Sequence, residues 1–160
     1  MEFENLKNIL EDFGNQLVTE YKDKLILENI NASDALYNSV QYIVSTPTNG
    51  TFEVKLSLMD YWKYIENGRA AGKMPPISAI QKWVEIKPVL PRPMSNGKLP
   101  TVQQLSYLIA HKIGLEGTKG KHILQRSIDE VWDVYREFIG EAIAKDIDKE
   151  ITFELGKLRV

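Results

Sequence analysis

The residues that could do chemistry are few, and the first of them are Glu53 and Lys55, two positions apart on one predicted strand. An acidic residue, one spacer and a lysine form half of a metal-dependent nuclease site, in which a carboxylate holds the cation and the lysine steadies charge on the attacked phosphate. The carboxylates that could complete it are Asp34 and Asp60. A charged solvent face of an amphipathic strand explains the same pair without catalysis. A small nuclease therefore stays an alternative.

Two glycine- and lysine-bearing loops suggest phosphate binding, Gly68–Lys73 (GRAAGK) and Gly117–Lys121 (GTKGK). Neither has the four-residue spacing between glycines or the hydroxyl residue of a P-loop, and neither follows a predicted strand. We interpret both as exposed loops that contact solvent or a partner. The candidate interface residues in and beside them are Arg69, Lys73, Met74, Lys119 and Lys121.

Metal and thiol chemistry have little support in the composition. The chain has no cysteine, which excludes disulfides and thiolate ligands, and its two histidines, His111 and His122, have only Glu116 as a nearby candidate ligand. With 160 residues, 43% apolar and 26% charged, the chain matches one globular domain over residues 1–160. Its net charge of −2 argues against a protein that mainly grips nucleic acid.

The termini and hydropathy indicate where the protein is made. The first residues are acidic and amphipathic and lack the basic start and apolar core of a signal peptide. No run of 18 apolar residues exists, so we expect no membrane span. Synthesis and folding in the cytoplasm follow as the expectation.

Hydrophobic periodicity predicts an α+β fold. A long N-terminal amphipathic helix has one apolar stripe, formed by Phe3, Leu6, Leu10, Phe13, Leu17, Tyr21 and Leu25. Alternating residues then predict a β-hairpin over about 37–59, with its turn at Pro47 and Asn49-Gly50. We expect this small antiparallel sheet to pack against the long N- and C-terminal helices.

A helix–loop–helix flap is predicted over 61–87. Its first helix ends at Gly68, and Pro76 begins the second, which carries Trp83. A stiff proline-rich connector follows over 88–100.

The remaining chain predicts two more helices. Thr101 and Gln104 form a capping box for the first, which we expect Gly114 to end. The last long helix precedes a candidate C-terminal arm over 151–160, whose alternation fits either a strand or a frayed helix end. The apolar residues of that arm, Ile151, Phe153 and Leu155, are further interface candidates.

The order of these pieces resembles the tail-completion, or neck, proteins of tailed bacteriophages, also described as head–tail joining or minor capsid proteins. The resemblance rests on an aromatic-x-x-Tyr-x-Glu-x-Gly stretch, then on a loop that ends in proline, and then on a small loop before a long helix. The matching residues here are Tyr61, Tyr64, Glu66 and Gly68, then Met74, Pro75 and Pro76, then Gly117–Gly120 and Ile123 onward. The connector and the helix from Thr101 depart from that pattern.

The resemblance implies a structural protein with no catalytic residue, metal or cofactor. Such proteins form rings of about six or twelve subunits that extend the portal channel and contact portal, adaptor and tail proteins. Genomic DNA passes through without sequence-specific binding. The expected location is the virion neck, after assembly in the bacterial cytoplasm. A host-directed interaction module that binds one protein through residues 61–83 is a further alternative.

Overall fold

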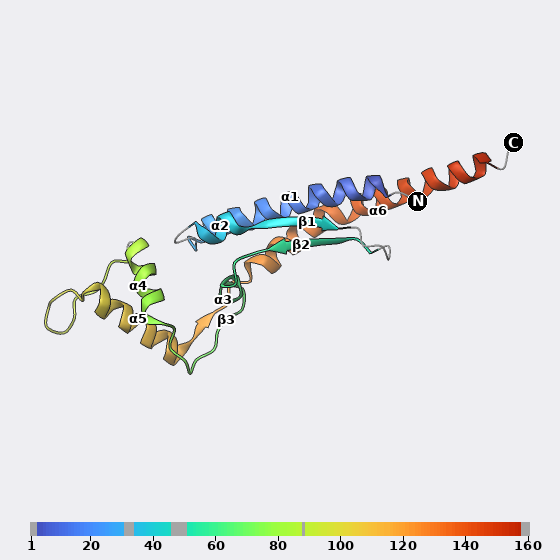
Figure 1. Ribbon diagram of the computed structural model, residues 1–160. Helices are drawn as coiled ribbons and strands as arrows, with labels where there is room; N and C mark the ends of the chain where they lie inside the picture. The colour runs from blue at the N-terminus through green and yellow to red at the C-terminus, as the bar shows by residue number, and fades with distance from the viewer. Residues whose placement is uncertain (1–2, 31–33, 46–50, 88, 158–160) are drawn as a thin grey trace.

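Two long helices, one from each end of the chain, form the body of the molecule and run antiparallel to each other (Figure 1). The computed structural model describes residues 3–30, 34–45, 51–87 and 89–157. In chain order the elements are α1 (Glu4–Leu27), α2 (Ala35–Ser39), β1 (Gln41–Ser45), β2 (Glu53–Ser57), α3 (Trp62–Asn67), β3 (Gly68–Arg69), α4 (Ile77–Ile86), α5 (Val102–Glu116), β4 (Thr118–Lys119) and α6 (Ile123–Lys157). The α+β prediction is confirmed.

The hairpin of β1 and β2 lies along α1 and α6, and its inward side chains form the core with them. The predicted alternation is confirmed, because Val54 and Leu56 pack against Phe13, Leu17 and Val131. A second cluster buries Tyr21, Leu25, Leu36, Val40 and Ile123. The predicted hairpin turn at 46–50 lies outside the described residues.

A close contact explains why α1 carries a glycine in its middle. The ring of Tyr42 on β1 lies directly on Gly14, where a Cβ atom would come within 2.3 Å of the ring. The sheet can therefore approach the helix more closely than any larger residue would allow.

Helices α4 and α5 pack on each other as a separate lobe at one end of the body (Figure 1). The predicted 61–87 flap is therefore not one unit: α3 contacts α6 in the body, whereas α4 belongs to the lobe. The expectation that Gly114 ends the helix is also wrong. Helix α5 continues to Glu116, and Gly114 is buried within it because Met74 packs where a side chain would lie.

The proline-rich connector links two helices that touch, so it must turn back on itself. Over residues 89–100 it contains no helix or strand, and Met94 N donates to the carbonyl of Lys98 at 2.9 Å. The capping box is confirmed: Gln104 N donates to Thr101 Oγ1 at 3.3 Å, and Thr101 N donates to Gln104 Oε1 at 3.0 Å.

The last residues of the chain continue a helix. Helix α6 includes 151–157, so the strand alternative for this arm is wrong over those residues, whereas 158–160 lie outside the description. Figure 1 shows this end of α6 projecting past the start of α1. In the described part of the chain, no helix is long and apolar enough to cross a bilayer.

Two polar contacts connect α1 to α6, one through the buried Asp146 and one between the buried Lys24 and the exposed Glu130. Asp146, 1% exposed, accepts hydrogen bonds from the amides of Asn5 (3.1 Å) and Leu6 (2.9 Å), and so caps α1 from another helix. Burial opposes its ionisation, but the bonds from Leu6 and Asn5 outweigh that effect and hold the pKa of Asp146 below its ordinary value. Burial would lower the pKa of Lys24, but Glu130 at 2.6 Å and Glu20 raise it.

We expect Asp146→Ala to lower the free energy of unfolding by about 1–3 kcal/mol at neutral pH, because the buried amide of Leu6 and the part-buried amide of Asn5 lose their acceptor. Urea denaturation measures this, and Asp148→Ala, at an exposed position two residues on, is the matched control. Since the folded-state pKa is depressed, the contribution is present above the unfolded pKa and is lost as pH falls through the folded pKa. The gap between wild type and variant should narrow in acid; equal stabilities at neutral pH would contradict this role.

Candidate subunit and partner interface

The two glycine- and lysine-bearing loops, far apart in sequence, meet as a pair of crossing strands. β3 pairs antiparallel with β4, with Gly68 opposite Lys119 and Arg69 opposite Thr118. The sequence analysis placed interface candidates on both loops but did not predict that they pair. We call residues 66–74 and 114–122 the strand crossing; it carries the chain from body to lobe and back (Figure 1).

Three glycines allow the two strands to come this close. Gly68 ends α3 with φ +73°, and a Cβ there would lie 2.1 Å from the carbonyl oxygen of Thr118. Gly117 ends α5 with φ +72°, and its Cβ would lie 2.2 Å from the carbonyl oxygen of Arg69. At Gly120 the obstacle is the carbonyl oxygen of Glu66 at 2.3 Å. Gly68 and Gly117 have similar conformations, so the crossing is nearly symmetric. The sequence analysis recognised Gly68 as a helix end but expected Gly114, not Gly117, to end the second helix.

Glu66 connects the crossing to the long C-terminal helix. Its carboxylate, in a residue only 8% exposed, accepts from the amides of Leu124 at 2.8 Å and Gln125 at 3.0 Å. Its backbone carbonyl accepts from His122 N at 3.2 Å. A carboxylate at a helix N-terminus both satisfies free amides and meets the positive end of the helix dipole. Glu66 therefore fixes where α6 begins.

Tyr21 of α1 lies next to this capped helix end, in the larger core cluster. Burial, with smaller contributions from the charge of Glu66 and from Tyr61, raises the pKa of Tyr21 to about 12. The phenol of Tyr21 therefore stays neutral at physiological pH.

The basic residues of the crossing take different partners. The guanidinium of Arg69 lies over the ring of Tyr64, 5.6 Å from its centre. Lys121 donates to Glu28 of α1 at 3.2 Å, and Arg126 also pairs with Glu28. The bond from Arg126, followed by that from Lys121, lowers the pKa of Glu28 against the opposing effect of burial.

Two lysines of the crossing remain available for a partner. Lys73 and Lys119 are exposed, and within the described residues no carboxylate lies within ion-pair distance of either. Lys119 lies on β4 and Lys73 lies in the loop that follows β3, so both are exposed on the connection between body and lobe.

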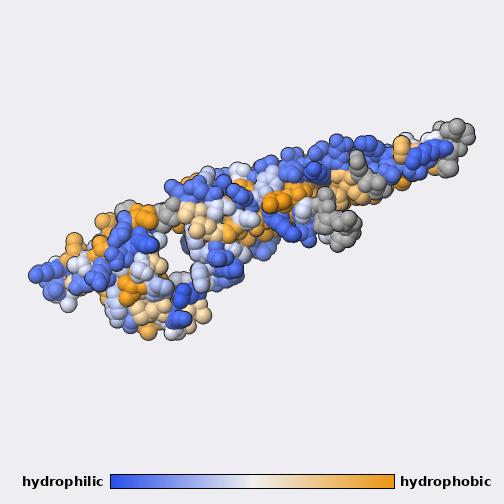
Figure 2. All heavy atoms as spheres, in the orientation of Figure 1, coloured by the Kyte–Doolittle hydropathy of each residue, from blue (hydrophilic) through white to orange (hydrophobic). Residues whose placement is uncertain are grey.

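A cleft of about 450 Å³ separates the lobe from the body beside the crossing, and Figure 2 shows the opening. Trp83 and Lys87 of the lobe face Glu28 and Asn29 of the body across it. The Lys87 ammonium donates to the carbonyl of Asn29 and lies 5.9 Å from the centre of the Trp83 ring. This hydrogen bond therefore connects the lobe to the body at a second place, in addition to the strand crossing.

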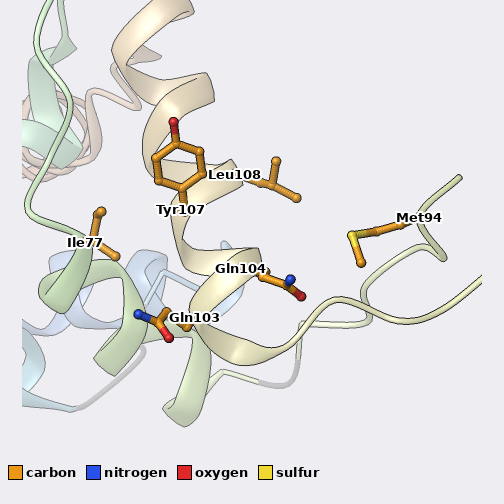
Figure 3. A pocket seen from close by; sticks show the side chains of 6 residues that line it. All are labelled: Ile77, Met94, Gln103, Gln104, Tyr107 and Leu108. Atoms are coloured by element: carbon orange, nitrogen blue, oxygen red, sulfur yellow. The ribbon is translucent and has the colours of Figure 1, made fainter. Parts of the chain in front are cut away.

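The lobe also has a hollow of its own, of about 380 Å³, between α5, the start of α4 and the connector (Figure 3). Tyr107 and Leu108 of α5, Ile77 of α4 and Met94 of the connector supply its apolar wall, and two glutamines lie at its edge. Its chemistry suits an apolar side chain of another protein.

The predicted site residues fall into two separate groups. The crossing brings together Arg69, Lys73, Met74, Lys119 and Lys121, whereas Ile151, Phe153 and Leu155 are exposed at the far end of α6. The residues predicted as a structural motif gather around the crossing or the base of the lobe: Tyr61, Tyr64, Glu66 and Gly68 in or beside α3, Pro75 and Pro76 before α4, and Trp83 within α4.

The nuclease alternative gains no support from the geometry. Glu53 and Lys55 pair with each other at 2.8 Å on the outer face of β2. No group of three His, Cys, Asp or Glu side chains among the described residues is placed to hold a metal ion, and this includes His111 and His122 with Glu116. Comparison of the chain with protein-family models, curated proteins and solved structures finds no match.

We expect Gly68→Ala to destabilise the fold more than Gly97→Ala. Both glycines have φ near +74°, but a Cβ at Gly97 meets nothing within 4 Å, whereas one at Gly68 meets the facing strand. The strained φ alone costs about 1–2 kcal/mol, so the excess at Gly68 reports the crossing itself. Urea denaturation of both variants measures the difference, and equal losses would show that the crossing tolerates a side chain.

Proposed function

We propose that this chain is a ring-forming structural protein of a tailed-phage virion, which joins the portal to the tail. The observation that carries the proposal is the distribution of apolar side chains. Among the residues that the structure describes, the exposed large apolar side chains outnumber the buried apolar ones. Exposed apolar surface on this scale marks a protein-binding surface.

The exposed apolar residues lie on more than one face of the molecule. Tyr107, Leu108 and Leu115 are exposed on the lobe, whereas Val134 and Phe138 are exposed on the body. In Figure 2 hydrophobic residues reach the surface of both parts. A closed ring needs two different surfaces on each subunit, because every copy contacts one neighbour with each of them. This arrangement supports a ring better than a single docking patch.

The residues behind the phage resemblance also form one physical unit, which supports using the resemblance. Glu66, Gly68, Gly117 and Gly120 all meet at the strand crossing, although half of them lie about fifty residues from the rest. A shared structural requirement explains the spacing of these four residues better than a chance similarity between loops does. A mildly acidic chain, with net charge −2, also suits a channel through which DNA passes without sticking.

Mass photometry of the purified chain, with protein analysis of purified virions, tests this proposal. We expect a species at a whole multiple of the subunit mass, and the chain in virions at ring stoichiometry. A chain that stays monomeric and is absent from virions would contradict the proposal. A one-to-one complex with a host protein would favour the interaction-module alternative.

A further inference from the structure

Charge is divided unevenly between the two parts of the molecule. Residues 67–121, the crossing strands and the lobe, contain nine Lys or Arg and only two acidic residues, Glu85 and Glu116. The remaining sequence contains eleven Lys or Arg and twenty Asp or Glu. The small net charge of the chain therefore hides a basic lobe and an acidic body, and opposite charges on two parts of one subunit favour contact between copies.

The acidic surface of the body includes an outward face of α6. Five exposed residues spaced as helical neighbours alternate acidic and apolar side chains, and we call them the acidic stripe: Asp133, Val134, Glu137, Phe138 and Glu141. Val134 is 58% exposed and Phe138 is 50% exposed, so both are available to a partner.

The basic surface of the lobe includes the matching face of α5. Its exposed residues also follow helical spacing, and we call them the lobe face: Tyr107, Leu108, His111, Lys112 and Leu115. Arg92 and Lys98 of the neighbouring connector add positive charge, and within the described residues neither has a carboxylate at ion-pair distance. Each face thus combines exposed apolar side chains with charges mainly of one sign. The opposite charges beside them form exposed pairs within the same helix, Lys112 with Glu116 at 3.8 Å and Asp133 with Arg136 at 3.5 Å.

We propose that the lobe face of one copy binds the acidic stripe of the next copy, head to tail. In this contact Phe138 enters the hollow beside Tyr107 and Leu108, and Lys112 lies against the carboxylates of the stripe. The proposal rests on the proposed ring and names the contact that closes it.

Geometry requires the contact to form between chains. The stripe begins ten residues into α6, about 15 Å from its start, and ends about 27 Å from it, whereas the lobe lies beyond that start (Figure 1). Glu66 and the crossing hold the lobe there, so one copy cannot join its own two faces. The observations favour a protein partner over nucleic acid for the lobe, because a phosphate backbone gives Tyr107, Leu108 and Leu115 nothing apolar to contact.

Charge reversal tests the contact with the full-length chain, by sedimentation at low salt and high protein concentration. Lys112→Glu alone or Glu137→Lys alone should weaken self-association about tenfold or more, because like charges then face each other. The double variant, or an equimolar mixture of the two single variants, should restore it. In the mixture the two variants can alternate around the assembly. Each junction then pairs either the native lobe face with the native stripe or the reversed lobe face with the reversed stripe.

Matched controls separate this contact from general charge effects. Lys82→Glu on α4 and Asp148→Lys on α6, both at exposed positions outside the two faces and outside the candidate arm at 151–160, change charge by the same amount and should leave association within about twofold of wild type. Circular dichroism checks that each variant is folded. Failure of the double variant to recover would overturn the proposed contact.

The outcomes distinguish this inference from the proposed function. If the wild type assembles and enters virions but the charge variants do so equally well, the ring stands and this contact is wrong. A wild-type chain that remains monomeric overturns the contact, and virion analysis then decides the function. Salt-dependent binding of duplex DNA by a lobe that does not self-associate would assign the basic surface to nucleic acid instead.

Discussion

The Glu66 carboxylate is the interaction on which the arrangement of the molecule depends. It caps the N-terminus of α6 with two hydrogen bonds while its own backbone accepts from the chain that enters the helix. Because α6 packs along α1 for most of its length, its starting point also sets the position of the body's core. Glu66 also lies just before β3 in the sequence, so it helps to fix the direction in which the chain leaves the body for the lobe.

The strand crossing makes this connection narrow. In the described part of the chain, two short strands carry the backbone between body and lobe, and glycines at 68, 117 and 120 let these backbones come close. The tether from Lys87 to Asn29 adds a second point of support across the cleft. A lobe held away from the body keeps its α5 face exposed, which is what contact with a neighbouring subunit requires. The fold thus holds the basic lobe apart from the acidic outward face of α6 within one copy.

Local patterns predicted most of the body, since its elements follow from side-chain periodicity alone. The apolar stripe of α1 and the alternation in β2 lie where the sequence predicted them, and in the lobe the Thr101 capping box begins α5 as predicted. Long-range backbone contacts could not be predicted in this way. Two such contacts depend on which distant segments meet: the pairing of Gly68 with Lys119 and the packing of Met74 on Gly114. From the sequence alone, a glycine that ends a helix cannot be distinguished from one that allows a close backbone approach. The sequence left both a strand and a helix open for residues 151–157, because two patterns overlap there. The alternation of apolar residues fits a strand, whereas Ile147, Ile151 and Leu155 follow the i, i+4 spacing of a helix, which is the structure observed.

The central claim is that the lobe exists to meet the next copy of the chain, and cross-linking between isotopically distinct copies tests it most directly. Unlabelled and nitrogen-15-labelled chains are mixed, and a zero-length reagent joins lysines to carboxylates in contact. The account predicts cross-links between Lys112 and Glu137 or Glu141, with half of the linked peptide pairs combining one labelled and one unlabelled partner. Linked pairs that are always of one isotope, or an absence of this link from assembled particles, would contradict it.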